Sequence, residues 1–331
     1  MNFRLNYSKK IEAVCLVDST RSLLLYALVY GKDQFESTFF FVSDAISVDV
    51  CNKLVYFKKL SRQKFCNKGF IGRFLTRYFL CHCAYLRWPF LKSVPIYGAD
   101  HLWFSSLLVR KRSITVIEDG LSNYNESTIM ETIIDKHQIL YRKSFGPLLC
   151  KGAYGYSDQV PQVILTGITT IPECIKNKVV VINMFDLWKA FEDKSFLLSL
   201  FGVTVNDLSI LQKKHILILT QPYNVDIGDE ELIKIYQKVV QSYRKEDILI
   251  KTHPRDTINY ELYFQDITVY SKKMPVELFA LVGVNFTDIY TICSVAIFSF
   301  PDTIQKHFLG TACHPLLLEK YGKITMEDFA Q

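Results

Sequence analysis

The chain has 331 residues, 49% of them hydrophobic and 22% charged, which is enough apolar material for a sizeable core and a length that favours two domains over one. Its formal charge of +6 suits an acidic partner such as a nucleotide, an anionic glycan or a lipid headgroup. The sequence has no zinc-finger or RNA-recognition signature, which argues against binding of nucleic acid. Nine cysteines lie mostly in apolar runs without C-x-x-C spacing, as is typical of reduced thiols in a cytosolic protein.

The membrane signals in the sequence are weak. The first residues carry charges and no long apolar run, so they do not resemble a secretory signal, and no window of about 20 residues predicts a spanning helix. Residues 70–88 are the best amphipathic stretch. They fit either a helix that rests on a bilayer surface or a core-facing helix with a basic outer edge, and the second arrangement is the commoner one in globular domains.

The first part of the chain alternates between strand and helix patterns. A buried strand at 11–17 precedes a helix at 21–30, and strands at 37–42 and 53–57 follow. Next come a helix at 70–88, a weak strand at 93–97, a helix at 102–108 and a strand at 114–117. Beyond these we expect a helix at 126–137, an irregular segment at 141–156, strands at 160–165 and 179–182, and helices at 184–191 and 196–200.

The same rhythm restarts further along the chain, with a strand from 213 to 219, a helix at 229–242 and a strand that begins at 247. A strand at 267–270, a helix at 275–282 and a mixed segment at 287–299 follow. Such alternation predicts two α/β units with parallel sheets. We expect an N-terminal domain over residues 1–175, a linker region over 176–212 and a C-terminal domain over 213–331.

Three short loops follow predicted strands: EDG at 118–120, KTHPR at 251–255 and TICS at 291–294. Each has an ordinary explanation on its own, as a turn, a surface loop or a helix cap. Open α/β sheets bind their ligands at the carboxyl ends of the strands. The placement of all three loops at strand ends therefore indicates a functional site.

The residue types in these loops fit one kind of reaction. A carboxylate can remove a proton from an acceptor hydroxyl, and an adjacent carboxylate can raise its pKa or orient it. A histidine between Lys251 and Arg255 can bind a phosphate and offset charge on a leaving group. A serine at a helix start adds an anion site. Together they predict a transferase whose leaving group carries a phosphate.

With EDG at 118–120, HP at 253–254 and a serine motif at Ser294, the chain resembles the bacterial sialyltransferases of the GT-B type and, among them, glycosyltransferase family 52. LTQPY at 219–223 is similar to the start of that family's nucleotide domain. The resemblance is better from about Asp100 onward. It implies an α/β, GT-B-like fold of two Rossmann-like domains with a cleft between them. It also implies transfer of sialic acid, with inversion, from CMP-sialic acid to a terminal galactose of lipooligosaccharide or capsule.

By this resemblance Asp119 is the general base, Glu118 is its catalytic neighbour, and His253 contacts the CMP phosphate as acid or charge stabiliser. Further substrate contacts are implied for Lys251 and Ser294 on the phosphate, Glu277 on the ribose, and Gly120, Gln221, Pro254, Ser19 and Thr20. Cys293 and Val295 flank Ser294, so the family's doubled hydroxyl is missing here. The loop at 18–20 lacks the T-P-x-Q pattern, which leaves acceptor specificity open.

The resemblance implies no cofactor, and we expect no metal, because protein cations can neutralise the single phosphate of CMP and no Asp-x-Asp pair occupies a strand end. We expect a cytoplasmic protein, with peripheral contact to the inner membrane and a homodimer both left open. Two alternatives remain. One is a GT-B glycosyltransferase with a different nucleotide-sugar donor. The other is a non-catalytic protein that binds a glycan or a membrane surface through residues 70–88.

Overall fold

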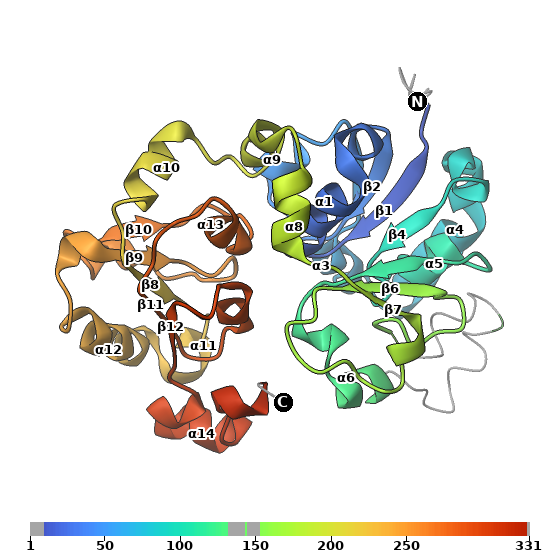
Figure 1. The fold of residues 1–331 in the computed structure, drawn as a ribbon. Helices are drawn as coiled ribbons and strands as arrows, with labels where there is room; N and C mark the ends of the chain where they lie inside the picture. Colours follow the sequence, from blue (N-terminus) through green and yellow to red (C-terminus); the bar gives the residue numbers. More distant parts are fainter. Residues whose placement is uncertain (1–9, 132–142, 144–152, 330–331) are drawn as a thin grey trace. The chain divides into compact units, whose positions relative to one another are not determined.

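The structure is a computed structural model that describes residues 10–131, 143 and 153–329. The chain separates into two compact units (Figure 1). The first unit contains the residues up to Gly167 together with Ile171–Leu200, and the second contains Ile168–Thr170 together with the residues from Phe201 onward. Each unit holds one parallel sheet, so the predicted pair of α/β units is confirmed.

The first unit is built on a seven-stranded parallel sheet in the order β3-β2-β1-β4-β5-β6-β7. The strands are β1 (Ala13–Val17), β2 (Thr38–Val42), β3 (Tyr56–Lys59), β4 (Ile96–Gly98), β5 (Thr115–Ile117), β6 (Gln162–Leu165) and β7 (Val179–Val181). Every residue of β1 and β2 is buried. Their continuous apolar runs, AVCLV and TFFFV, are what a parallel strand with helices on both faces requires.

The helices of the first unit follow the strands in βα order. They are α1 (Thr20–Glu36), α2 (Val48–Cys51), α3 (Arg62–Cys66), α4 (Phe70–Arg87), α5 (Ser105–Val109), α6 (Glu126–Glu131), α8 (Met184–Ala190) and α9 (Lys194–Leu200). Ser19 caps α1, because its side chain accepts a hydrogen bond from the Ser22 N–H, as serines commonly do at this position.

The division between the units differs from the predicted one. The expected linker at 176–212 contains β7, which pairs with β6, and both α8 and α9, which pack against α1. These elements complete the first unit up to Leu200. The sequence patterns at 179–182, 184–191 and 196–200 were sound, but periodicity along the chain carries no information on which sheet a strand joins.

The second unit has a five-stranded parallel sheet in the order β10-β9-β8-β11-β12. Its strands are β8 (Ile216–Leu219), β9 (Ile248–Lys251), β10 (Thr268–Tyr270), β11 (Asp288–Thr291) and β12 (Gln305–Phe308). Its helices are α10 (Val205–Leu211), α11 (Asn224–Ile227), α12 (Asp229–Val240), α13 (Glu277–Leu281) and α14 (Pro315–Tyr321).

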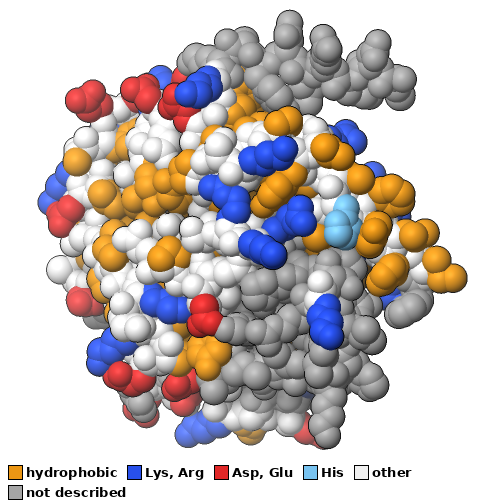
Figure 2. All heavy atoms as spheres, turned by 90° about the vertical axis from the view of Figure 1, so that its right-hand side faces the viewer, with side chains coloured by type: hydrophobic (Ala, Val, Ile, Leu, Met, Phe, Trp, Pro, Cys, Tyr) orange, Lys and Arg blue, Asp and Glu red, His pale blue; other side chains and the backbone are white. Residues whose placement is uncertain are grey.

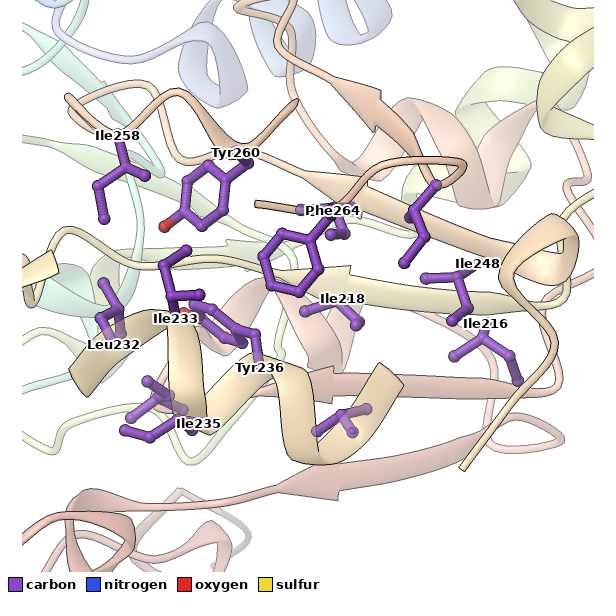
Figure 3. Packing of buried hydrophobic residues seen from close by; sticks show 14 of the residues in the cluster. Ile216, Ile218, Leu232, Ile233, Ile235, Tyr236, Ile248, Ile258, Tyr260 and Phe264 are labelled. Carbon is purple, nitrogen blue, oxygen red and sulfur yellow. The ribbon is translucent and has the colours of Figure 1, made fainter. Parts of the chain in front are cut away.

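The core of the second unit fixes the loops that follow β8 and β9. Tyr236 of α12 is buried among Ile218, Tyr260 and Phe264, as Figure 3 shows. Its hydroxyl accepts a hydrogen bond of 3.0 Å from the N–H of Gln221, directly beyond β8. The apolar face of α12 thus packs beneath the sheet while one of its side chains holds a strand-end loop in place.

Helix α4 confirms the helix predicted at 70–88, but the favoured core-facing arrangement is wrong. Its buried side is narrow, with Cys81 in contact with Leu107. The large side chains of Ile71, Phe79 and Leu86 are 72%, 61% and 75% exposed. The apolar stripe of this helix therefore faces solvent in the described structure.

Both sheets have a point at which the direction of winding reverses. In the first sheet the chain runs from β1 outward to β3 and then returns to the other side of β1 as β4; in the second, β11 lies on the other side of β8 from β9. Loops beyond the strands separate at such a point and leave room for a ligand. In the first unit Gly98 ends β4 with a φ of +104°, and a Cβ there would lie 2.1 Å from the carbonyl oxygen of Leu16.

Gly98→Ala is expected to lower the free energy of unfolding by about 2–4 kcal/mol, because it combines a positive φ with a backbone clash. The measurement is denaturant unfolding followed by circular dichroism. Gly69→Ala is the matched control, because Gly69 has a φ of −56° and a Cβ there meets nothing within 4 Å. Equal stability of the two variants would show that β4 does not approach β1 this closely.

Candidate active site

The carboxyl ends of four neighbouring strands bring polar side chains together in the first unit. Asp18 follows β1, His101 follows β4, Asp119 follows β5 and Thr166 follows β6. The strands are adjacent in the order β1-β4-β5-β6, so residues separated by up to 148 positions in the sequence lie at one edge of the sheet. This edge contains the predicted EDG motif.

Glu118 is completely buried and its oxygens are fully engaged. Arg21 donates to Oε1 from Nε at 3.0 Å and from Nη2 at 2.6 Å. Tyr124 donates its hydroxyl to Oε2 at 2.8 Å, and Thr166 donates its backbone N–H and its hydroxyl to the same oxygen at 2.6 and 2.7 Å. This carboxylate ties α1 to the ends of β5 and β6. Such geometry supports a positioning role for Glu118.

Asp119 has the opposite environment. Its side chain is 18% exposed, and its Oδ1 is buried without a hydrogen-bond partner among the described residues. Burial raises the pKa of Asp119; the charge of His101 opposes this shift, and the charge of Asp18 adds to it. The neighbouring carboxylate that raises the pKa is thus Asp18, from another strand. An uncompensated carboxylate oxygen with a raised pKa is suited to accept a proton.

His101 lies between the two aspartates. Its Nε2 is 3.3 Å from Oδ2 of Asp18 and 3.8 Å from Oδ2 of Asp119. Burial lowers the pKa of His101, but the hydrogen bond to Asp18 and the charges of Asp119 and Asp100 outweigh burial and raise it. Burial likewise raises the pKa of Asp18, and the hydrogen bonds from His101 and Ser43 more than reverse that shift. The imidazole of His101 thus lies within ion-pairing distance of both carboxylates.

The same three residues could hold a cation, since each offers a ligand atom and these atoms lie within 4.8 Å of one another. Two carboxylates and one imidazole are a donor set that divalent metals accept. A protonated His101 would meet the same need, because an imidazolium between two carboxylates already supplies the positive charge. The raised pKa of His101 favours the proton.

Tyr154 covers His101 from one side, with ring centroids 4.5 Å apart and planes inclined by 21°. Its φ of +55° is unusual for a non-glycine residue. Buried Asp100 holds this conformation, because its carboxylate accepts the N–H groups of Tyr154 at 2.7 Å and Gly155 at 2.9 Å. Backbone strain of this kind persists only where surrounding contacts fix it. Asp100 thus holds the ring of Tyr154 in the position where it stacks on His101.

Small residues complete the loops of this edge. Asn123 accepts the N–H of Asp119 at 2.9 Å and that of Gly120 at 3.4 Å. Gly120 has a φ of +156°, and a Cβ there would meet nothing within 4 Å, so its backbone conformation, and not crowding, favours glycine. Ser19 Oγ donates to the carbonyl of Asp119 at 3.3 Å, and Thr20 is the first residue of α1 beside it.

Asp18 and His101 also line a cavity of about 730 Å³ within the first unit. Its other walls include Phe65 and Trp103, which stack at 4.2 Å, and three arginines, Arg62, Arg73 and Arg77. This volume lies in the range of small-molecule sites. The lining therefore combines Asp18 and His101, the neighbours of Asp119, with three basic side chains.

In the second unit His253 lies just beyond β9. Its N–H donates to Thr220 Oγ1 and to Asp256 Oδ2, both at 2.9 Å. Its Nδ1 accepts the N–H of Arg255 at 3.1 Å, which leaves the ring proton on Nε2. Burial, and then the charges of Arg255 and Lys251, lower the pKa of His253 to about 4. The side chain is therefore a neutral hydrogen-bond donor near pH 7.

Lys251 and Glu277, which were predicted to contact the donor, are both buried. Lys251 ends β9, and its Nζ donates to the carbonyl of Thr252 at 2.7 Å. Burial lowers the pKa of Lys251 to about 8, an effect that the charges of Asp256 and Glu277 partly offset. Glu277 is 4% exposed and begins α13. Lys251 and Glu277 are thus both buried, and their contacts with a nucleotide stay predictions.

The remaining predicted residues of this unit also lie at strand ends. Gln221 follows β8, and exposed Pro254 follows His253. Ser294 lies beyond β11 at the start of a short 3₁₀ helix, and its N–H donates to Thr291 Oγ1 at 2.9 Å. Thr291 is buried, and Cys293 and Val295, which flank Ser294, offer no second hydroxyl.

The predicted residues thus form two clusters, one in each unit. Glu118, Asp119, Gly120, Ser19 and Thr20 belong to the first unit, and Gln221, Lys251, His253, Pro254, Glu277 and Ser294 belong to the second. Sequence reasoning missed His101 and the anchor Asp256. His101 could have been found from its position, because ADH at 99–101 follows the weak strand pattern at 93–97. A polar residue just beyond a predicted strand is the signal that the other three loops also carry.

Comparisons with known proteins show the family and the fold of the chain. The sequence model of glycosyltransferase family 52 matches residues 91–317, which is more than half of the chain. The chain belongs to glycosyltransferase family 52. An uncharacterised protein of Haemophilus influenzae is 31% identical over 323 residues, which cover 96% of this chain and 100% of that relative.

Solved structures confirm the GT-B fold. An α/β-galactoside α-2,3-sialyltransferase of Photobacterium phosphoreum matches with a TM-score of 0.53 and 14% identity over 91% of both chains. The GT-B domain of a sialyltransferase of Photobacterium damselae matches with a TM-score of 0.56 and 13% identity over 90% of both chains. At such low identity the likeness concerns the fold. The matched family 52 region includes both the EDG and the HP motifs.

The two neighbouring acids should respond differently to loss of charge. Glu118→Gln is expected to lower the free energy of unfolding by about 3–5 kcal/mol, because it removes the negative charge that offsets the charge of buried Arg21. Asp119→Asn is expected to leave stability unchanged or slightly higher, since a carboxylate with a raised pKa is disfavoured in its ionised form. Differential scanning calorimetry of both variants is the measurement.

Glu12→Gln serves as the control, because Glu12 precedes β1 and is exposed. A larger loss of stability in Asp119→Asn than in Glu118→Gln would reverse the assignment of structural and chemical roles.

Proposed function

We propose that this family 52 member is a sialyltransferase that transfers sialic acid from CMP-sialic acid to the galactose terminus of a bacterial surface glycan. The observation that carries the proposal is Asp119, a partly buried carboxylate with a raised pKa and a buried Oδ1 without a hydrogen-bond partner among the described residues, at the carboxyl edge of the first sheet. The resemblance of the EDG and HP motifs to those of sialyltransferases supports the choice of donor.

In the proposed reaction Asp119 Oδ1 takes the proton of the acceptor hydroxyl as that oxygen attacks the anomeric carbon of sialic acid. The bond between this carbon and the phosphate oxygen breaks, CMP leaves with the electron pair, and the configuration inverts. The acceptor occupies the cavity beside Asp18 and His101. His101 keeps the charge of Asp119 balanced before proton transfer, and Glu118 holds the loop by its contacts with Arg21.

On the donor side, Nε2–H of neutral His253 donates to the phosphate of CMP. Negative charge that develops on the leaving phosphate strengthens this hydrogen bond as the bond to sialic acid breaks. Lys251 adds positive charge from within the wall, Glu277 accepts from the ribose hydroxyls, and the loop at Ser294 contacts the phosphate. Lys251 and the hydrogen bond from His253 offset the charge of the single phosphate, as a metal often does for diphosphate donors. We therefore propose that no metal or cofactor is needed.

The compartment and the assembly are also proposals. The described cysteines are all free, and buried Cys15 has a pKa raised by burial, which suits a reducing cytoplasm. A homodimer remains a prediction from the family resemblance.

The direct test is incubation with CMP-sialic acid and a panel of galactosides while CMP release is followed. We expect release only with a galactose-terminated acceptor, and a loss of at least about a hundredfold in Asp119→Asn with CMP affinity within about twofold. The assay is run with and without a chelator, and a rate that falls on chelation would contradict the metal-independent part of the proposal.

The rival donor is tested in the same preparation by thermal stabilisation with CMP and with UDP. Stabilisation by UDP alone would replace the sialyltransferase proposal with another family 52 glycosyltransferase activity. Equal activity of wild type, Asp119→Asn and His253→Ala would contradict catalysis at this site.

The pKa of His253 should rise when a phosphate binds. Its pKa of about 4 in the free protein leaves it neutral at pH 7, and a neighbouring phosphate favours the charged form, so its pKa should rise on addition of CMP. The measurement is the pH titration of the His253 ring signals by NMR, with His253→Asn as the assignment control. An unchanged pKa in the CMP complex would place the phosphate away from this ring.

A further inference from the structure

Helix α4 presents an apolar stripe to solvent. Along its 18 residues large apolar side chains recur at the i, i+3, i+4, i+7 and i+8 positions of one helical face. The exposed members of this stripe are Ile71, Phe74, Leu75, Tyr78, Phe79 and Leu86. Exposed apolar side chains are ordinary when scattered, but a continuous helical stripe with three members more than 60% exposed indicates a binding surface.

The segment around this helix is strongly basic. Residues 50–99 contain ten Lys and Arg and no Asp or Glu, so the remainder of the chain, with 29 Lys and Arg against 33 Asp and Glu, is net acidic. Arg62 and Lys64 of α3 and Lys68 before α4 are exposed. Figure 2 shows basic and hydrophobic side chains intermingled on the side of the molecule where α4 lies in Figure 1.

No single helix among the described residues is long and apolar enough to cross a bilayer, although α9 and α10 taken together meet that test. A helix with an exposed apolar stripe and flanking cations has the properties of one that lies in the plane of a membrane surface. We propose that α4 and the adjacent basic loop, residues 61–87, dock on a bilayer that contains anionic lipid. The stripe enters the headgroup region and the cations contact the lipid phosphates.

Charge favours a lipid surface over the other occupants of this face. A symmetric dimer through α4 would place the same acid-free segment of each copy against the other, and like charges across an interface are unfavourable. A protein partner would have to supply both a large apolar groove and an acidic rim. An anionic bilayer supplies both kinds of contact over any area.

The docked face adjoins the candidate acceptor cavity. Arg73 and Arg77 of α4 line the same cavity as Asp18 and His101. If the proposed function holds, a glycan carried on a membrane lipid would enter this cavity from the side of the arginines. Only this consequence rests on the proposed function, because the docking itself requires no donor or acceptor.

The test is flotation of the full chain with vesicles of phosphatidylcholine alone or with 30% phosphatidylglycerol, a composition chosen as roughly that of an anionic leaflet. We expect binding to the anionic vesicles only, weakened by high salt. The triple variant Ile71→Gln, Phe79→Gln, Leu86→Gln should bind at least about tenfold less. The matched control, Val205→Gln, Val225→Gln, Leu262→Gln, changes three apolar residues of the second unit that are each at least 70% exposed and should bind like wild type.

Each other outcome would overturn the docking proposal. Equal binding by both triple variants would do so, and so would equal binding to both kinds of vesicle. Monomerisation of a wild-type dimer by the α4 variant, seen in light scattering, would instead assign the face to a second copy. CMP release with a soluble galactoside should be the same in the α4 variant and wild type. Vesicle binding by a protein that releases no CMP with any galactoside would contradict the proposed function but would still support the docking of α4 on the bilayer.

Discussion

The buried ion pair between Arg21 and Glu118 is the interaction on which the candidate site depends. A carboxylate with no exposure is stable only when its charge and its lone pairs are satisfied, and here a guanidinium, a phenol, a hydroxyl and a backbone N–H satisfy it. The pair joins α1 to the ends of β5 and β6. Arg21, Tyr124 and Thr166 together occupy both oxygens of Glu118. The acid left with an open oxygen is therefore the next residue, Asp119. A double acid at a strand end thus divides into an anchor and a reactive group.

The two units shift the pKa values of their central residues in opposite directions. In the first unit, burial beside Asp18 raises the pKa of Asp119. In the second, burial beside cations lowers the pKa of His253 to about 4. The raised pKa suits Asp119 to accept a proton, and the lowered pKa leaves His253 as a neutral hydrogen-bond donor for an anion. Titratable groups whose environments separate their pKa values in this way are typical of acid–base sites. Each of the two lies at the carboxyl edge of its own sheet, where open α/β folds bind their ligands.

Much of this could be predicted from the sequence, and the failures have physical causes. The motifs at 118–120 and 253–254 are local, and the α/β alternation placed both at strand ends. His101 was missed because β4 is only three residues long and ends in a glycine of positive φ, so no run of β-branched residues marks it. The anchor role of Glu118 depends on Arg21, which is 97 residues away. A partner at that separation leaves no pattern in one sequence.

Helix α4 shows a different limit. The same amphipathic pattern fits a helix that buries its apolar stripe and one that exposes it, because periodicity defines a face and not the neighbour of that face. The charge distribution around the helix carries the missing information. A core-facing helix needs no particular charge on its flanks. The 50 residues around α4, by contrast, contain none of the chain's Asp and Glu residues. A segment that combines an apolar stripe with such a one-sided charge is better explained by an anionic surface than by a protein core.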